Sequence, residues 1–142
     1  MIIDLLKKVC KALNEIDIPY MLSGSIAMNL YTIPRMPRDI DIVLELPINK
    51  INDFIELFPD SYIDKDMILQ EIKRNGMFYV IDSETGFKID FILRKNTEYY
   101  QTAFQNRLKR LEFDTELYVI SLNDLILAKI IWIQEYQSDQ QL

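Results

Sequence analysis

Three acidic residues stand inside apolar segments of the sequence, where carboxylates are rarely found. Asp39 and Asp41 lie one residue apart in DIDIVLEL (residues 39–46), and Asp90 lies in FKIDFIL (residues 87–93). Side chains of a β-strand alternate between its two faces, so Asp39 and Asp41 should point the same way. Two carboxylates held side by side repel each other and are costly to desolvate. A divalent cation resolves both problems, and Mg²⁺ fits best because it prefers oxygen ligands such as carboxylates and substrate phosphates.

Each acid also has a simpler explanation. The Asp39–Asp41 pair could be the acidic outer face of a half-exposed strand. Asp90 could lie on a solvated face and pair with Lys88, two residues earlier on the same face. As a third acid beside the other two, Asp90 would instead complete a two-metal site. The explanations differ in geometry, because the metal site requires the strand of Asp90 to lie beside the strand of the pair.

A Gly-Ser pair precedes the first two acids. Gly24 and Ser25 follow the short apolar segment YMLS (residues 20–23) and precede a short helical pattern. Glycine lets the backbone approach a ligand closely, and the N-terminus of a helix offers free N–H groups to phosphate. The same pair is also a common turn and helix cap. The sequence leaves both explanations open.

Helical and strand-like segments alternate along the chain. We expect helices at residues 2–15, 25–31, 49–57, 66–74 and 97–107 and a last helix that begins at the capping box SLND, from Ser121. We expect strands at residues 20–23, 39–46, 77–82 and 87–93 and two short strands within 108–120. The turn SETG could join the third and fourth strands as a hairpin. This order predicts an α/β or α+β fold with a mixed β-sheet flanked by helices, in one domain spanning residues 1–142.

The composition excludes several kinds of chemistry. Histidine is absent, which removes His-based general bases, Ser-His and Cys-His nucleophiles and the usual zinc sites. The net charge of −6 argues against a broad nucleic-acid surface. No apolar stretch approaches the roughly 20 residues of a membrane helix, and the first residues show no signal-peptide pattern, so we expect a cytoplasmic protein without membrane contact. Cys10 and the apolar residues of the last helix are expected in the core, among them Ile126, Leu127, Ile130 and Trp132.

Together the motifs resemble the DNA polymerase β-like nucleotidyltransferase superfamily. Its pattern is Gly-Gly or Gly-Ser, a spacer, Asp-h-Asp and a later h-Asp-h strand, where h is apolar. Here Gly24-Ser25 is followed by thirteen residues, by Asp39-Ile40-Asp41 and later by Asp90. More closely, SGSIAMNLYTIPRMPRDIDIVLEL and SLNDLILAKIIW resemble the small bacterial nucleotidyltransferases around the AbiEii toxin group. The resemblance implies a minimal nucleotidyltransferase fold over the whole chain.

The resemblance also implies a role for each motif residue. Asp39 and Asp41 would hold two Mg²⁺ ions, with Mn²⁺ as an alternative. Asp90 would join the ion nearest the attacking hydroxyl and help to accept its proton. Gly24 and Ser25 would hold the β- and γ-phosphates of an NTP.

Three basic residues are further candidates for nucleotide binding. Arg35 aligns with the family arginine if Pro37 stands where Thr or Ser usually does, which leaves open whether Arg35 or Arg38 faces the nucleotide. Lys129 aligns with a late-helix lysine that similar proteins use near the phosphates. Each could instead be a solvated surface charge, although Lys129 interrupts the apolar run LILAKIIWI and should need a partner there.

The implied reaction moves an NMP from an NTP such as ATP to an acceptor hydroxyl. Three acceptors remain open: an RNA end in a toxin, a small molecule in antibiotic resistance, or a protein in an antitoxin. The protein acceptor is disfavoured because similar protein-modifying antitoxins usually carry Arg-Gly two residues after Gly-Ser-x-Ala, and GSIAMNLY lacks it. The non-enzyme alternative is a module that binds a nucleotide or a partner. A homodimer or a partner chain also remains open.

Overall fold

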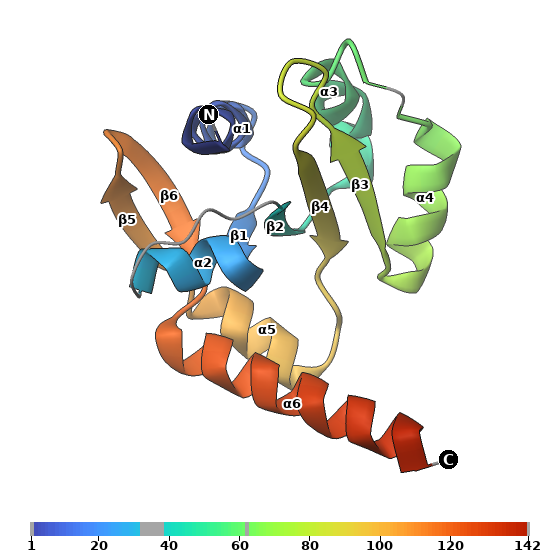
Figure 1. Ribbon diagram of the computed structural model, residues 1–142. Helices are drawn as coiled ribbons and strands as arrows, with labels where there is room; N and C mark the ends of the chain where they lie inside the picture. The colour runs from blue at the N-terminus through green and yellow to red at the C-terminus, as the bar shows by residue number, and fades with distance from the viewer. Residues whose placement is uncertain (1, 32–38, 62, 142) are drawn as a thin grey trace.

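The structure is a computed structural model that describes residues 2–31, 39–61 and 63–141, with side chains described as far as Glu135. Its strands form one mixed sheet in the order β3–β4–β2–β1–β6–β5 (Figure 1). The strands are β1 Tyr20–Ser23, β2 Asp39–Leu44, β3 Met77–Ile81, β4 Lys88–Leu93, β5 Leu108–Glu112 and β6 Thr115–Val119. The helices are α1 Ile2–Glu15, α2 Gly24–Tyr31, α3 Ile51–Glu56, α4 Lys65–Arg74, α5 Glu98–Gln105 and α6 Leu122–Gln141, with a 3₁₀ turn at Ile48–Lys50 before α3. The predicted mixed sheet with flanking helices is confirmed.

Strand directions explain how the sheet is wound. β2 runs parallel to β4 and antiparallel to β1, and β1 runs parallel to β6. β3 and β4 form the antiparallel hairpin predicted around SETG, and β5 and β6 form a second antiparallel pair. β2 and β4 are far apart in the sequence, yet they pair along their full length at the centre of the sheet.

The apolar face of the central strands is buried in the core. On β2, Ile40, Ile42 and Leu44 are completely buried and alternate with half-buried residues. On β4, Phe91 packs edge-to-face against Phe54 of α3, with ring centroids 5.0 Å apart. This burial fixes the register of β2 and β4, because a slip of one residue would move carboxylates into the core.

The last helix is more exposed than the sequence analysis predicts. The Ser121 hydroxyl accepts from the Asp124 amide at 3.2 Å and donates to its carboxylate at 2.8 Å, so Ser121 caps the start of α6 as predicted, and the reciprocal bond of Asp124 is to the Ser121 hydroxyl. Leu125 is buried, but the side chains expected in the core are exposed by 46% for Ile126, 47% for Leu127, 45% for Ile130 and 64% for Trp132. That prediction is wrong because apolar residues surround much of the helix, whereas it packs on one side only.

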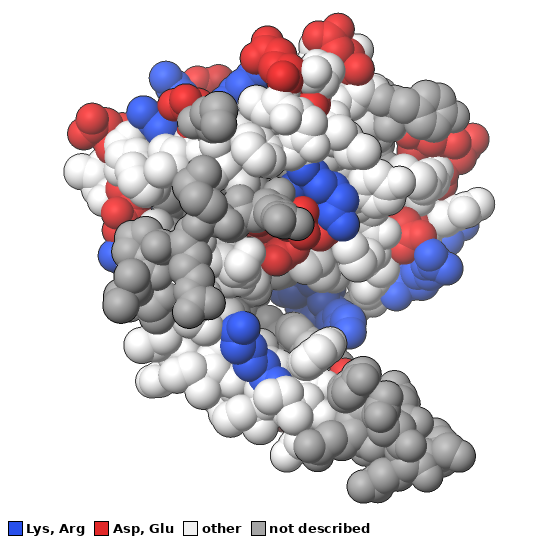
Figure 2. All heavy atoms as spheres, in the orientation of Figure 1, with Lys and Arg blue, Asp and Glu red and all other residues white. Residues whose placement is uncertain are grey.

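The position of α6 explains why its apolar side chains are exposed. The helix lies beside α2 and is fastened to α5 by a hydrogen bond from the Tyr99 hydroxyl to the Asp124 carbonyl, at 2.6 Å. Its C-terminal half extends past the rest of the fold (Figure 1), and most of its described surface in this view is uncharged (Figure 2). Among the described residues, no helix combines the length and the apolarity needed to cross a membrane.

The single cysteine behaves as expected. Cys10 is completely buried on the inner side of α1. Burial raises the pKa of its thiol to about 12, so the thiol stays protonated at neutral pH. Cys10 therefore serves as core packing.

Candidate active site

The pairing of β2 with β4 brings the three acids to one place. Their parallel register sets Asp39 opposite Lys88 and Asp41 opposite Asp90. Paired residues on adjacent strands point to the same face of a sheet, so these four side chains share the face opposite the aromatic core. Asp39 and Asp41 are half-buried, and Asp90 is only 8% exposed. The geometric condition that separates a shared acidic site from a remote surface acid is thereby met.

The carboxylates of Asp41 and Asp90 affect each other directly. The pKa of Asp41 is raised to about 6, first by burial, then by the negative charge of Asp90 and a hydrogen bond with it, and then by Asp39. Two adjacent carboxylates resist being ionised together unless a cation lies beside them. The pair is therefore a place where positive charge is favoured.

Lys88 supplies one positive charge to this face. Its Nζ lies 3.3 Å from Oδ1 of Asp90 and 5.7 Å from the centroid of the Tyr79 ring. The Asp90 carboxylate raises the pKa of the ammonium most, and Asp39 and Asp41 raise it further. The salt bridge of the simpler explanation is thus present, but its acid is buried beside Asp41 and does not lie on a solvated face. Asp90 Oδ1 itself is buried, and the Lys88 ammonium is the cation that lies beside it.

The start of α2 lies against Asp41. Ser23 is paired with Asp41 across β1 and β2, and Gly24 follows with a positive φ of +62°. A Cβ on Gly24 would stand 1.9 Å from Oδ2 of Asp41, so any side chain there would collide with the carboxylate. Ser25 is exposed in the first turn of α2. The backbone therefore approaches the acidic site as closely as glycine alone permits.

The donor set suits a hard divalent cation, although the three acids do not surround one point. Among the described side chains, no group of three acidic, thiol or imidazole residues is gathered as a ready metal site. The raised pKa of Asp41 nevertheless marks a carboxylate beside Asp90 at which a cation would be favoured. A cation held by two carboxylates and by phosphate oxygens fits this arrangement, and use of all three acids requires a side chain to turn.

A cavity of about 780 Å³ adjoins the acids. It lies between the sheet face and α6, and its lining includes Gly24, Asp41, Met77, Ile92, Lys129 and Trp132. The volume is within the range of small-molecule sites, ~300–1,000 Å³. Lys129 thus lies on the same cavity as Gly24 and Asp41, and no ion-pair partner for it is found among the described side chains.

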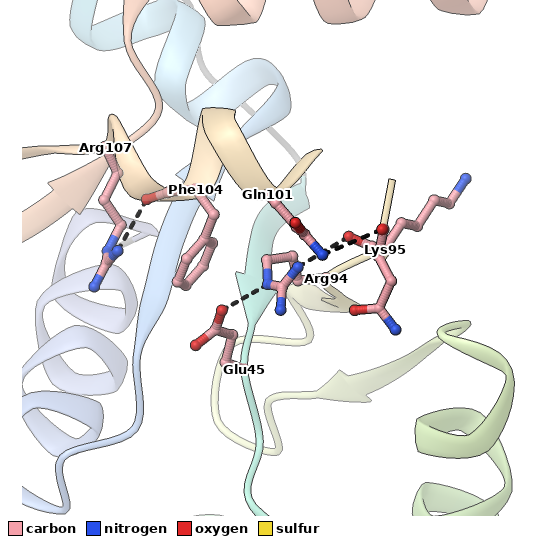
Figure 3. Close-up of polar contacts among 7 residues, drawn as sticks. Glu45, Arg94, Lys95, Gln101, Phe104 and Arg107 are labelled. Atoms are coloured by element: carbon pink, nitrogen blue, oxygen red, sulfur yellow. Dashed lines mark hydrogen bonds and ion pairs between the residues drawn. The ribbon is translucent and has the colours of Figure 1, made fainter. Parts of the chain in front are cut away.

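A second lysine on this cavity was missed by the sequence analysis. Lys95 follows β4 and lines the cavity, with its Nζ 5.3 Å from the centroid of the Tyr100 ring. Its backbone is held by Arg94, whose guanidinium donates to Glu45 at 2.6 Å and to the Lys95 carbonyl at 3.1 Å. Figure 3 shows the Lys95 side chain extending away from the Arg94–Glu45 pair. The sequence carries no spacing signal for Lys95, because its place depends on where β4 ends.

Two predicted residues lie outside the described part of the chain. Arg35 and Arg38 fall within residues 32–38, so their role in nucleotide binding stays a prediction.

Solved structures with the same fold include proteins named as a nucleotidyltransferase, an adenylyltransferase and an antibiotic-resistance factor. TM1012, a candidate nucleotidyltransferase from Thermotoga maritima, has a TM-score of 0.69 and 13% identity over 98% of this chain and 89% of its own. The lincosamide antibiotic adenylyltransferase LnuA has a TM-score of 0.57 and 14% identity over 86% and 82%. The antibiotic-resistance factor ANT(2'')-Ia has a TM-score of 0.56 and 14% identity over 93% and 71%. At these identities the likeness establishes the fold.

Comparison of the sequence with curated proteins and with family models identifies the family. No curated protein sequence matches the chain, and the resemblance to AbiEii-type proteins stays a prediction. A family model described as "Nucleotidyltransferase of unknown function (DUF6036)" matches residues 1–141. The chain therefore belongs to the DUF6036 family of nucleotidyltransferases.

Proposed function

We propose that the protein is a Mg²⁺-dependent enzyme that transfers an NMP from an NTP to an acceptor hydroxyl. One observation carries the proposal: Asp41 and Asp90 lie side by side on adjacent strands, on the same sheet face as Asp39. The Gly24 backbone touches this acidic site, and a cavity of about 780 Å³ adjoins it. Mn²⁺ is expected to replace Mg²⁺, since both take oxygen ligands.

Each residue of the site has a distinct task in the proposed reaction. Mg²⁺ bound by Asp39 and Asp41 would neutralise charge on the phosphates during an in-line displacement. The Gly24 amide, the Ser25 hydroxyl and the Lys129 ammonium would bind the β- and γ-phosphates. Asp90 would take the proton of the acceptor hydroxyl as its oxygen bonds to the α-phosphorus. The bond from the α-phosphorus to the β-phosphate oxygen then breaks, and pyrophosphate leaves.

A small hydroxylated molecule is the proposed acceptor, with ATP as the proposed nucleotide. Two structural neighbours support this choice, because their names are those of an antibiotic adenylyltransferase and an antibiotic-resistance factor. The net charge of −6 also disfavours a long nucleic-acid acceptor. An RNA end or a protein acceptor in a toxin–antitoxin pair, and nucleotide binding without transfer, are the competing outcomes.

Label transfer tests the proposal directly. The protein is incubated with each α-³²P-labelled NTP, Mg²⁺ and one of three acceptor pools: small hydroxylated molecules, total RNA or cell protein. Label in the small-molecule pool, absent with EDTA and with Asp41→Asn, is the expected result. Label in RNA or protein would replace the acceptor. No label in any pool, with nucleotide still bound, would indicate a binding module.

A further inference from the structure

The Lys88 ammonium lies next to the Asp90 carboxylate, so a side chain of the protein already supplies a cation to this acid. Lys88 begins β4 opposite Asp39 in the parallel register, and its side chain points to the face that carries the three acids. Its ammonium lies 3.3 Å from Oδ1 of Asp90, an oxygen that is buried. The ammonium is therefore the positive partner of this oxygen among the described residues.

The surroundings of Lys88 hold its ammonium on this face. The Tyr79 ring, directly opposite Asp90 on β3, lies 5.7 Å from Nζ, so the ammonium faces both a carboxylate and an aromatic ring. The side chain of Asp90 is 12% exposed, and the side chain of Lys88 is 42% exposed. An ion pair with a buried acid is screened by water less than an ordinary surface pair.

The charge of the site then matches one divalent ion. Asp39, Asp41 and Asp90 contribute three negative charges, and Lys88 contributes one positive charge, which leaves −2 on this face. This count covers the protein side of the site, and a bound NTP adds its own negative charge. One ion at Asp39 and Asp41 matches the protein charge without displacing Lys88, whereas a second ion at Asp90 would compete with the ammonium for the same carboxylate.

We infer that Lys88 is a built-in cation of the active site: its ammonium occupies the side of Asp90 that a second divalent ion would take, so that the protein binds one divalent ion for each NTP. This inference rests on the proposed function and replaces the expectation of two ions. Lys88 acts as a positioning residue, because it orients the Asp90 carboxylate.

The proposed transfer step stays balanced with this arrangement. The acceptor oxygen forms its bond to the α-phosphorus, its proton passes to Asp90, and pyrophosphate leaves with the electron pair of the broken P–O bond. Lys88 remains an ammonium throughout, because a charged lysine has donors but no acceptor. Its role is to hold the Asp90 carboxylate in position until the proton arrives.

Counting bound ions tests the inference without measuring catalysis. Mn²⁺ is titrated into the protein with a saturating non-hydrolysable NTP analogue, and free Mn²⁺ is measured by EPR after equilibrium dialysis. We expect one ion per bound nucleotide in the wild type and in Lys88→Arg, which keeps the charge. Lys88→Met should bind two ions, with the second at least tenfold tighter than any second ion in the wild type.

A matched control separates this effect from the loss of any ion pair. Lys109 lies 3.3 Å from Glu116 on the β5–β6 hairpin, outside the site, so Lys109→Met removes a pair of the same separation. It should still bind one ion. Melting curves by circular dichroism report whether each variant folds, and Lys88→Gln replaces Lys88→Met if the latter does not.

The outcomes distinguish this inference from the proposed function. Two ions per nucleotide in the wild type, or equal ion counts in the wild type and Lys88→Met, would overturn the role of Lys88 while leaving nucleotidyl transfer intact. Failure of every variant to bind a Mn²⁺–nucleotide complex would overturn both.

Discussion

Asp41 and Asp90 are neighbouring carboxylates whose negative charges repel each other. Two half-buried or buried carboxylates on adjacent strands repel each other, and burial removes the water that would screen them. The pKa of Asp41, raised to about 6, reflects this burial and repulsion. A cation between the two carboxylates would relieve this repulsion, so the arrangement favours a positively charged ligand.

The raised pKa predicts how stability changes with pH. Because Asp41 titrates near 6 in the folded state and near 3.8 when unperturbed, the folded state binds more protons between these values. The free energy of unfolding should therefore fall as pH rises from about 4 to about 6 in the absence of divalent ions. Asp41→Asn should flatten this part of the profile, as measured by thermal melting monitored by circular dichroism. Parallel profiles for both proteins would contradict the assignment to Asp41.

Asp90 should separate binding from catalysis. Asp90→Asn keeps the size of the side chain but removes the group that accepts the proton, so transfer should fall by about 10²–10⁴-fold. Nucleotide affinity, measured by isothermal titration calorimetry, should change by less than about fivefold, since Asp39 and Asp41 remain. Asp53→Asn, an exposed acid in the first turn of α3, is the control and should transfer normally. Equal activity of Asp90→Asn and wild type would remove Asp90 from the reaction.

At the scale of secondary structure, the β1–α2 junction brings the Gly24 backbone so close to Asp41 that a side chain at position 24 would collide with it. Gly24 adopts a positive φ and touches the Asp41 carboxylate, so it serves both the turn and the approach to the site. A second glycine of the chain, Gly86, also has a positive φ but does not approach the site. Gly86, in the β3–β4 turn, has φ of +75° and no atom within 4 Å of an added Cβ.

The two glycines make a matched pair of substitutions. Gly24→Ala and Gly86→Ala should each destabilise the protein by about 1–2 kcal/mol, the cost of the left-handed conformation for a residue with a Cβ. Only Gly24→Ala should also displace Asp41 and lower nucleotide affinity, by at least about tenfold. Denaturant unfolding and calorimetry give the two readings. Equal nucleotide affinity in both variants would mean that Gly24 serves the turn alone.

For the whole molecule, α6 is the element whose apolar surface exceeds what the fold covers. Leu122, Ile126, Ile130 and Ile133 are each exposed by 40–47% and recur along one side of the helix. A contiguous row of exposed apolar side chains is a candidate partner interface. The cavity side of the same helix carries Leu125 and Lys129. A partner on α6 would therefore lie close to the proposed nucleotide site.

We expect α6 to mediate association of two copies of the chain. Analytical ultracentrifugation should show a dimer for the wild type at about 100 µM and a monomer for the double variant Ile126→Glu/Ile130→Glu. The control is Ile48→Glu, which places the same charge on an equally apolar side chain, 66% exposed, on the 3₁₀ turn before α3. A monomeric wild type would leave the apolar side of α6 for a different partner chain.

Much of the local structure was determined by the sequence itself. The period-two pattern of β2 set Asp39 and Asp41 on one face and Ile40 and Ile42 on the other, and the positions of the helices and of the β3–β4 hairpin followed from similarly local signals. The residue types alone also limited the chemistry to carboxylates, lysines and phosphate-binding backbone. These features depend on neighbours within a few residues, so a linear pattern contains them.

Only the tertiary structure decided which of these pieces meet. The pairing of β4 with β2 placed Asp90 beside Asp41 and Lys88 opposite Asp39, although 48 residues or more separate the partners. The end of β4 placed Lys95 on the cavity, and one-sided packing left Ile126 and Ile130 exposed. Periodicity encodes which face of an element is apolar. It does not encode which strand lies alongside or whether a partner covers that face, because these depend on contacts between residues distant in the chain.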